Sequence, residues 1–303
     1  DSWKVRLELA LNVDDPRESL HELQLALAIN PDNALVHYHL GNALLRQNDL
    51  SRARQHFDQA TRLKPDFADA FGSLGSVHFL QNHLDAAKSS FNQCLSFDPE
   101  NTNAHHNLGC VLDRQGEYAD AIEHFHAAIR LNFDGGQVRN NLGLALLHRG
   151  NSDDLDNAAR QFETAIDRQP DFKDAYFNLG LVKLRQQKRV EAVRQFRKTV
   201  SLDPDFVPAL HRLAWLLSTT GNRTRQSSEA IAFAERGATL TDHQDATILH
   251  ALATAHAHAG TFEAACEAID QALDVARQTG APELIENITF SAEQFHAGKT
   301  LAA

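Results

Sequence analysis

The chain has 303 residues, of which 43% are hydrophobic and 23% are charged, and its formal net charge is −11. Because nucleic-acid binding gains affinity from phosphates neutralised by Lys and Arg, this excess of acidic residues disfavours a nucleic-acid partner. No apolar stretch is long enough to span a membrane and no secretory signal is present, so we expect no direct membrane insertion.

A repeat of 34 residues organises the sequence. Leu-Gly pairs recur at this step, at Leu40–Gly41, Leu74–Gly75, Leu108–Gly109 and Leu142–Gly143. Prolines keep the same period at Pro31, Pro65 and Pro99. A fixed period of this length predicts a solenoid, in which small units stack into an elongated surface. The first question of function is therefore what that surface holds.

The period predicts eight repeats of two helices each, in a single solenoid over residues 1–303. The expected ranges are 1–33, 34–67, 68–101, 102–135, 136–172, 173–206, 207–245 and 246–279, followed by a capping helix at 281–297. The fourth repeat has three extra residues around Ser152–Asp154, and the sixth has about four near Asn222–Ser227. The outer repeats are degenerate, as capping repeats tend to be.

Small and apolar residues recur at helical spacing inside each repeat. The first helix carries Leu40, Gly41 and Leu44 on one side, and the second carries Ala53 and Phe57. Glycine inside a helix costs roughly 1 kcal/mol against alanine, so its recurrence at one position predicts a close helix–helix contact there.

Proline marks the helix ends, because it disfavours helical conformation in the preceding residue. The second helices are expected to end at the residues before the prolines, including Lys64, Asp98 and Asp203. The aspartates that follow the prolines are expected to cap the next helix: Asp66, Asp171 and Asp205. Such a cap is worth about 1 kcal/mol.

The order of leucine-glycine, alanine, phenylalanine, alanine and proline resembles the tetratricopeptide repeat family over nearly the whole chain. The resemblance implies an all-α fold, a right-handed superhelical solenoid of about eight helical hairpins with a C-terminal capping helix. It implies that the first helices line a concave groove. It also implies a non-enzymatic scaffold that binds an extended peptide or a partner helix in that groove, without a cofactor.

The first helices carry a polar stripe opposite the glycines, which the resemblance places in the groove. The predicted peptide-binding residues on this stripe are His39, Asn42, Ser73, Asn103, Asn107, Arg114, Asn141, His148, Asn178 and Arg185. Asn107, Asn141 and Asn178 each precede a Leu-Gly pair. Because an amide both donates and accepts, three in a row can pair with a peptide backbone. They resemble the asparagine ladder in the tetratricopeptide domain of O-linked N-acetylglucosamine transferase. A solvated or structural role is the alternative.

The sequence gives little support for a carboxylate clamp, a metal site or a catalytic site. The positions that clamp a C-terminal carboxylate in some tetratricopeptide co-chaperones lack the cations here. The seventeen histidines include no pair spaced i, i+4, and no phosphate loop or nucleophile elbow occurs, so we predict neither a metal site nor a catalytic one. Trp215 is interpreted as either an aromatic anchor or, as we expect, a residue buried beneath the sixth-repeat insertion.

Two other functions stay open. The late repeats, around 213–217 and 251–272, look like C-terminal repeats of large bacterial proteins, some of which join a glycosyltransferase, so the chain can be the substrate-recruiting arm of a larger enzyme. The basic stretch Lys183–Lys198 and the acidic residues after Ser227 also allow self-assembly into a homo-oligomer. The abrupt opening at Asp1-Ser2-Trp3 suggests a fragment of a longer protein.

Cysteine usage bears on the compartment. Cys94, Cys110 and Cys266 show no paired spacing, so neither a disulfide framework nor a zinc site is expected. This pattern favours a reducing compartment such as the cytoplasm. A periplasmic location stays open if a targeting segment has been removed.

Overall fold

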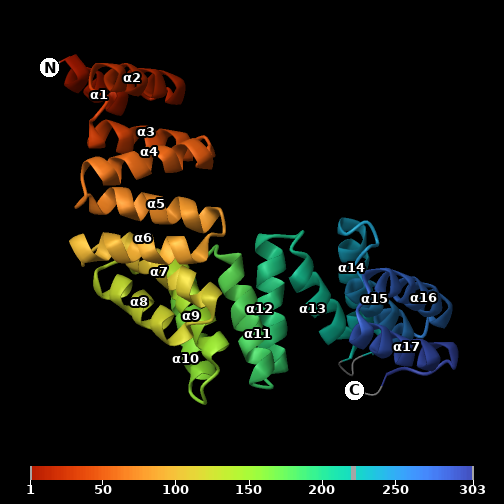
Figure 1. Ribbon diagram of the computed structural model, residues 1–303. Helices are drawn as coiled ribbons and strands as arrows, with labels where there is room; N and C mark the ends of the chain where they lie inside the picture. The colour runs from red at the N-terminus through yellow and green to blue at the C-terminus, as the bar shows by residue number, and fades with distance from the viewer. Residues whose placement is uncertain (1, 220–222, 302–303) are drawn as a thin grey trace. The chain divides into compact units, whose positions relative to one another are not determined.

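The computed structural model describes residues 2–219 and 223–301, with the side chains of 223–225 left out. In these ranges the chain forms seventeen helices and no strand (Figure 1). The chain divides into two compact bodies, which we call the N-terminal body (1–161) and the C-terminal body (162–303). The boundary lies within helix α10.

The N-terminal body consists of consecutive helical hairpins. Its helices are α1 (Ser2–Asn12), α2 (Pro16–Ile29), α3 (Ala34–Arg46), α4 (Leu50–Leu63), α5 (Ala68–Leu80), α6 (Leu84–Phe97), α7 (Thr102–Gln115), α8 (Tyr118–Arg130), α9 (Gly136–Arg149) and the start of α10 (Asp154–Arg168). Each helix packs against the next along the chain from α1 to α9, and α3, α5, α7 and α9 also contact one another in turn.

The C-terminal body continues the pattern. Its helices are the end of α10, α11 (Lys173–Arg185), α12 (Arg189–Leu202), α13 (Val207–Ser218), α14 (Arg223–Leu240), α15 (Ala246–Ala259), α16 (Phe262–Thr279) and α17 (Pro282–His296). The predicted all-α fold, with two helices in each of eight repeats and a final helix, is confirmed. That the eight repeats form a single solenoid stays a prediction.

The recurring glycine lies where the two helices of a hairpin meet. A Cβ atom added to it would lie under 3 Å from a phenylalanine ring: 2.5 Å for Gly41 and Phe57, 2.8 Å for Gly75 and Phe91, 2.7 Å for Gly109 and Phe125, and 2.6 Å for Gly180 and Phe196. These four phenylalanines are almost completely buried. The predicted packing reason for the glycine is therefore confirmed, because any side chain there would displace the ring.

We predict that Gly109→Ala lowers the stability of its hairpin by about 1–3 kcal/mol, although alanine favours the helix, because the new methyl group overlaps Phe125. The midpoint of urea denaturation, followed by far-UV circular dichroism, measures the change. Gly72→Ala is the matched control, because its new Cβ would lie 3.4 Å from Cys94 Sγ, an ordinary contact. It should stabilise α5 by up to about 1 kcal/mol. Equal midpoints for the two variants would contradict the packing role.

The predicted helix ends are confirmed, but the predicted caps are wrong. Lys64, Asp98 and Asp203 are the C-cap residues of their helices. The N-cap positions of the following helices are held by phenylalanines without a side-chain hydrogen bond, at Phe67, Phe172 and Phe206.

Apolar packing explains this difference. The Phe67 ring lies 5.0 Å from Tyr38, and the Phe206 ring lies 5.2 Å from Phe177, in each case a residue of the preceding hairpin. Burying an aromatic ring between hairpins stabilises the junction more than one exposed cap would.

The insertion of the fourth repeat forms the turn between its two helices. Gly150, with φ of 72°, ends α9, and α10 begins at Asp154. The buried Asp154 carboxylate accepts hydrogen bonds from the Arg149 guanidinium and from the backbone N–H of Asn151. The insertion expected in the sixth repeat begins at Asn222, which lies outside the described residues.

Candidate functional site

A polar hollow opens on the first-helix side of the N-terminal body. Its volume is about 260 Å³, and its lining comes from α3, α5, α6 and α7: Tyr38, Asp69, Gly72, Ser73, Ser76, Phe91, Asn101, Asn103, Ala104 and Asn107. We call it the amide hollow. It brings together three of the predicted binding residues, Ser73, Asn103 and Asn107, from two successive repeats.

Several polar groups of the amide hollow have no partner within the described part of the chain. Asp69, Ser73 and Asn103 make no side-chain hydrogen bond to another described residue. By contrast, Asn101 accepts from the backbone N–H of Ala104 at 3.0 Å, and the Ser76 hydroxyl donates to the Gly72 carbonyl at 3.0 Å. The hollow therefore offers an amide, a hydroxyl and a carboxylate to a bound molecule.

Asn141 is tied to its neighbours. Its Nδ2 donates to His106 Nε2 at 3.1 Å and lies 3.3 Å from Cys110 Sγ, and its Oδ1 accepts from Gln137 Nε2 at 3.1 Å. Asn178, in the C-terminal body, is only 9% exposed. Of the three asparagines that precede Leu-Gly pairs, Asn107 is the one that lines the amide hollow.

The group of Cys110, His106 and Asn141 resembles a nucleophile site only in its residue types. The Cys110 sulfur lies 3.9 Å from His106 Nε2. Burial raises the pKa of the Cys110 thiol to about 11 and lowers the pKa of His106. Because a cysteine attacks as the thiolate, a protonated thiol beside a neutral imidazole gives no activated nucleophile near neutral pH.

The predicted residues nearest the N-terminus have aromatic neighbours. The His39 ring meets Tyr38 edge-on at 5.2 Å, and burial, helped by the charge of Arg46, lowers the pKa of His39. Asn42 is half-buried on the same helix. The Arg114 guanidinium lies 4.5 Å above the centre of the Phe79 ring, so a cation–π contact holds it on the first-helix side.

The last two predicted residues are not among those that line the amide hollow. His148 donates from Nδ1 to the Asp113 carboxylate at 2.9 Å, and its ring lies 5.4 Å from Tyr118. Arg185 is exposed on α11 of the C-terminal body.

Two histidine pairs were not singled out from the sequence. His37 and His56 join Nδ1 to Nδ1 at 2.9 Å, and His105 and His124 repeat this distance two repeats later. In each pair the first histidine places Nε2 about 3 Å from a proline carbonyl. Because a carbonyl only accepts, that Nε2 must carry the proton, so its Nδ1 accepts from the second histidine. The 34-residue period could have revealed these pairs, because His37 and His105 occupy the same position in their repeats.

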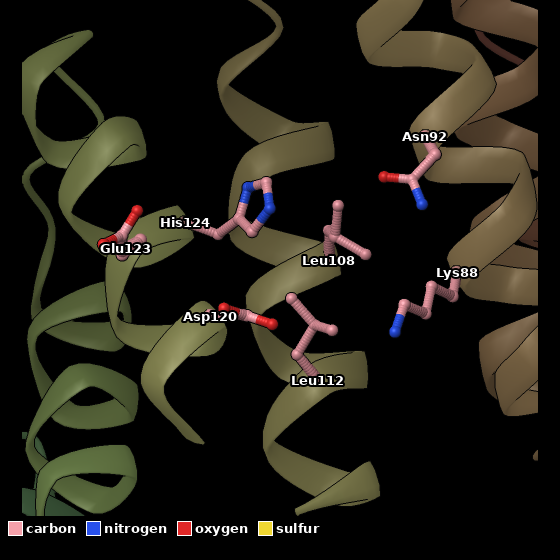
Figure 2. A pocket seen from close by; sticks show the side chains of 7 residues that line it. All are labelled: Lys88, Asn92, Leu108, Leu112, Asp120, Glu123 and His124. Carbon is pink, nitrogen blue, oxygen red and sulfur yellow. The ribbon is translucent and has the colours of Figure 1, made fainter. Parts of the chain in front are cut away.

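A second, smaller hollow of about 160 Å³ lies on the side of the second helices. Figure 2 shows Lys88 and Asn92 facing Asp120, Glu123 and His124 across Leu108 and Leu112. The Lys88 ammonium pairs with Glu117 at 2.5 Å, so this one cation is matched within the N-terminal body.

Comparison with known proteins identifies the family. Two tetratricopeptide repeat models match the sequence, one at residues 6–66, 40–101 and 151–205 and the other at 102–134. These ranges cover more than half of the chain. The chain belongs to the tetratricopeptide repeat family. No curated protein sequence matches it.

Solved tetratricopeptide repeat structures share the fold. YrrB, a TPR protein with an unusual peptide-binding site, is 27% identical with a TM-score of 0.54, covering 63% of this chain and 96% of YrrB. PilF of Pseudomonas aeruginosa is 18% identical with a TM-score of 0.60, covering 69% and 92%. The Cut9-Hcn1 hetero-tetramer structure is 17% identical with a TM-score of 0.60, covering 95% of this chain and 54% of that chain.

Tetratricopeptide repeat proteins are scaffolds that bind protein partners, and this chain has the architecture of one. Among the described residues, no group of three or more His, Cys, Asp and Glu side chains is placed to hold a metal ion. None of the described helices is both long enough and apolar enough to cross a bilayer.

Two of the seven cations in the basic stretch of this tetratricopeptide repeat protein pair with carboxylates of the C-terminal body. Lys183 lies 3.0 Å from Glu163 and 3.6 Å from Glu191, and Arg197 lies 2.6 Å from Glu229. An acidic partner for the five other cations stays a prediction.

Proposed function

We propose that this protein is a scaffold that binds an extended segment of a partner protein on the first-helix side of its N-terminal body. The segment lies over the amide hollow, and its backbone pairs with Ser73, Asn103 and Asn107. The observation that carries the proposal is a hollow in which Asp69, Ser73 and Asn103 lack partners among the described residues.

The chemistry of the lining supports recognition of a peptide backbone. A backbone presents alternating N–H donors and C=O acceptors, and amides and hydroxyls can pair with both. The hollow holds one carboxylate, Asp69, and no cation among its lining residues, so it is not built to select an acidic segment. The peptide-binding site of YrrB, which has a similar fold, supports the same kind of partner.

The test uses random-sequence peptides displayed on phage, from which several unrelated binders are selected and synthesised. Fluorescence anisotropy then measures their affinities. The double substitution Asn103→Ala with Asn107→Ala should lower the affinity for every peptide, by about 5-fold for each lost hydrogen bond. The effect should be general because peptides of every sequence make the same backbone contact.

Asn92→Ala is the matched control, because Asn92 is exposed on α6 on the side of the second helices. It should leave every affinity unchanged. Affinities that survive the double substitution, or that fall for one peptide alone, would reject backbone pairing at the amide hollow.

A further inference from the structure

The C-terminal body holds a larger hollow that the proposed peptide site does not use. Its volume is about 710 Å³, and its lining comes from α13, α15, α17 and residues 300–301. Helix α15 packs against both α13 and α17. The residues that line it are His211, Arg212, Trp215, Thr247, His250, Leu284, Asn287, Phe290, Ser291, Gln294, Thr300 and Leu301. Small-molecule sites commonly have volumes of about 300–1,000 Å³. We call it the Trp215 pocket.

One part of the pocket lining is apolar and solvent-accessible. Phe290 is 59% exposed, which is unusual for a phenylalanine in this chain, and Trp215 is half-buried. Leu284 and Leu301 extend the apolar lining. The Trp215 ring meets His250 edge-on at 5.2 Å, which fixes its orientation. The expectation that Trp215 is simply buried therefore needs revision, since it lines a hollow.

Another part of the lining is a hydrogen-bonded network. His250, only 7% exposed, donates from Nε2 to Ser291 Oγ at 2.8 Å, and the Ser291 hydroxyl donates to the Asn287 carbonyl at 3.0 Å. The serine hydroxyl has one proton, so the histidine must supply the other. This network joins α15 to α17. Burial lowers the pKa of His250 to about 4, so the imidazole is neutral near pH 7.

Arg212 supplies the charge. Burial lowers the pKa of both His211 and His250, so Arg212 is the one lining residue that is cationic near neutral pH. No carboxylate lines the pocket, and Arg212 forms no ion pair with the rest of the described chain. An arginine without an ion pair, in a pocket without a carboxylate and on a protein of net charge −11, favours the binding of a ligand with a single anionic group.

We propose that the Trp215 pocket binds a small amphiphilic carboxylate. The apolar body of the ligand packs against Trp215 and Phe290, and its carboxylate pairs with Arg212. A single cation in a lining that also holds Trp215 and Phe290 matches this combination, and a pocket bounded by three helices and residues 300–301 suits a small molecule. The proposal does not depend on peptide binding at the amide hollow.

The test uses Trp215 itself as the reporter. The chain has two tryptophans, so Trp3→Phe leaves Trp215 as the only one. Titration with decanoate below its micelle concentration should give a saturable change in Trp215 fluorescence. The neutral analogue 1-decanol should bind at least about tenfold more weakly, because it lacks the charge-assisted bond.

Three further variants separate charge from packing. Arg212→Gln should remove the preference for decanoate over decanol, and Arg194→Gln, which changes an exposed arginine of the same body, should keep it. Phe290→Ala should weaken both ligands by similar factors. Equal binding of the two ligands, or a preference that survives Arg212→Gln, would overturn the proposal. A response to a peptide with an apolar C-terminal residue but none to decanoate would overturn it too, in favour of a partner protein's C-terminus.

Discussion

Phe125→Ala is expected to lower the stability of the N-terminal body by about 3–5 kcal/mol, the range found when a buried aromatic ring is removed from a core. Phe125 is 1% exposed, its ring packs against the glycine face of α7, and His106 lies 5.9 Å away. Because Gly109 has no side chain that could move into the space, the cavity should persist. Urea denaturation followed by far-UV circular dichroism measures the loss.

The solenoid architecture determines how this loss of stability changes the urea transition. Each hairpin contacts only its neighbours, so a weakened central hairpin should broaden or split the urea transition as well as shift it. Hydrogen exchange would then show early loss of protection in α7 and α8. A sharp, unshifted transition would contradict the assigned role of Phe125.

Phe97→Ala is the matched control for this substitution. Phe97 lies on α6, is 44% exposed and stacks on Phe71 at 5.9 Å, so its removal should change stability by less than about 1 kcal/mol. The double variant Gly109→Ala with Phe125→Ala adds a second check. Because the ring that the new methyl group meets is gone, Gly109→Ala should cost little in this background.

The C-terminal body is expected to lose about 3 kcal/mol of stability as the pH falls from 6.5 to about 4, because of His250. Burial, with a smaller effect from the charge of His211, lowers the pKa of His250 to about 4. In this range the unfolded chain binds a proton at His250 that the folded chain does not, so acid favours unfolding. The contribution is complete above pH 6.5 and is lost progressively below it.

His250→Gln isolates this contribution, because an amide keeps an N–H donor for Ser291 but does not titrate in this range. Urea midpoints at pH 7.5 and 5.0, read from Trp215 fluorescence in the Trp3→Phe background, should differ less in the variant than in the parent protein. The control is His243→Asn, which removes an exposed histidine at a φ of 57° that asparagine tolerates. A variant that keeps the full pH dependence would show that His250 is not its source.

Much of the fold followed from the sequence because the determining features are periodic. The 34-residue step placed the helices in eight repeats, the prolines marked helix ends such as Lys64, and the glycines indicated close contacts with the phenylalanines. The two histidine pairs recur at the same repeat period, so the sequence contained the information needed to find them. The predicted caps at Asp66 and its counterparts were wrong because ring burial between hairpins outweighs one exposed hydrogen bond.

Whether a predicted binding residue is available for a partner depends on its neighbours in space, which its position in the repeat does not reveal. Asn107 and Asn141 occupy equivalent positions in successive repeats, yet Asn107 lines a hollow and Asn141 is held by His106 and Cys110. Whether such an asparagine lines a hollow or is hydrogen-bonded within the protein depends on the side chains of the preceding repeat. The Trp215 pocket likewise needs α13, α15 and α17 together with Thr300 and Leu301.

The sequence alone therefore determined the family, the helices and their packing positions, because these follow from spacing within a single repeat. Only the tertiary structure decided which polar groups remain available for a partner and where a cavity opens. The reason is that hydrogen bonds and cavities form between repeats, where side chains from separate helices compete for the same partners and the same space.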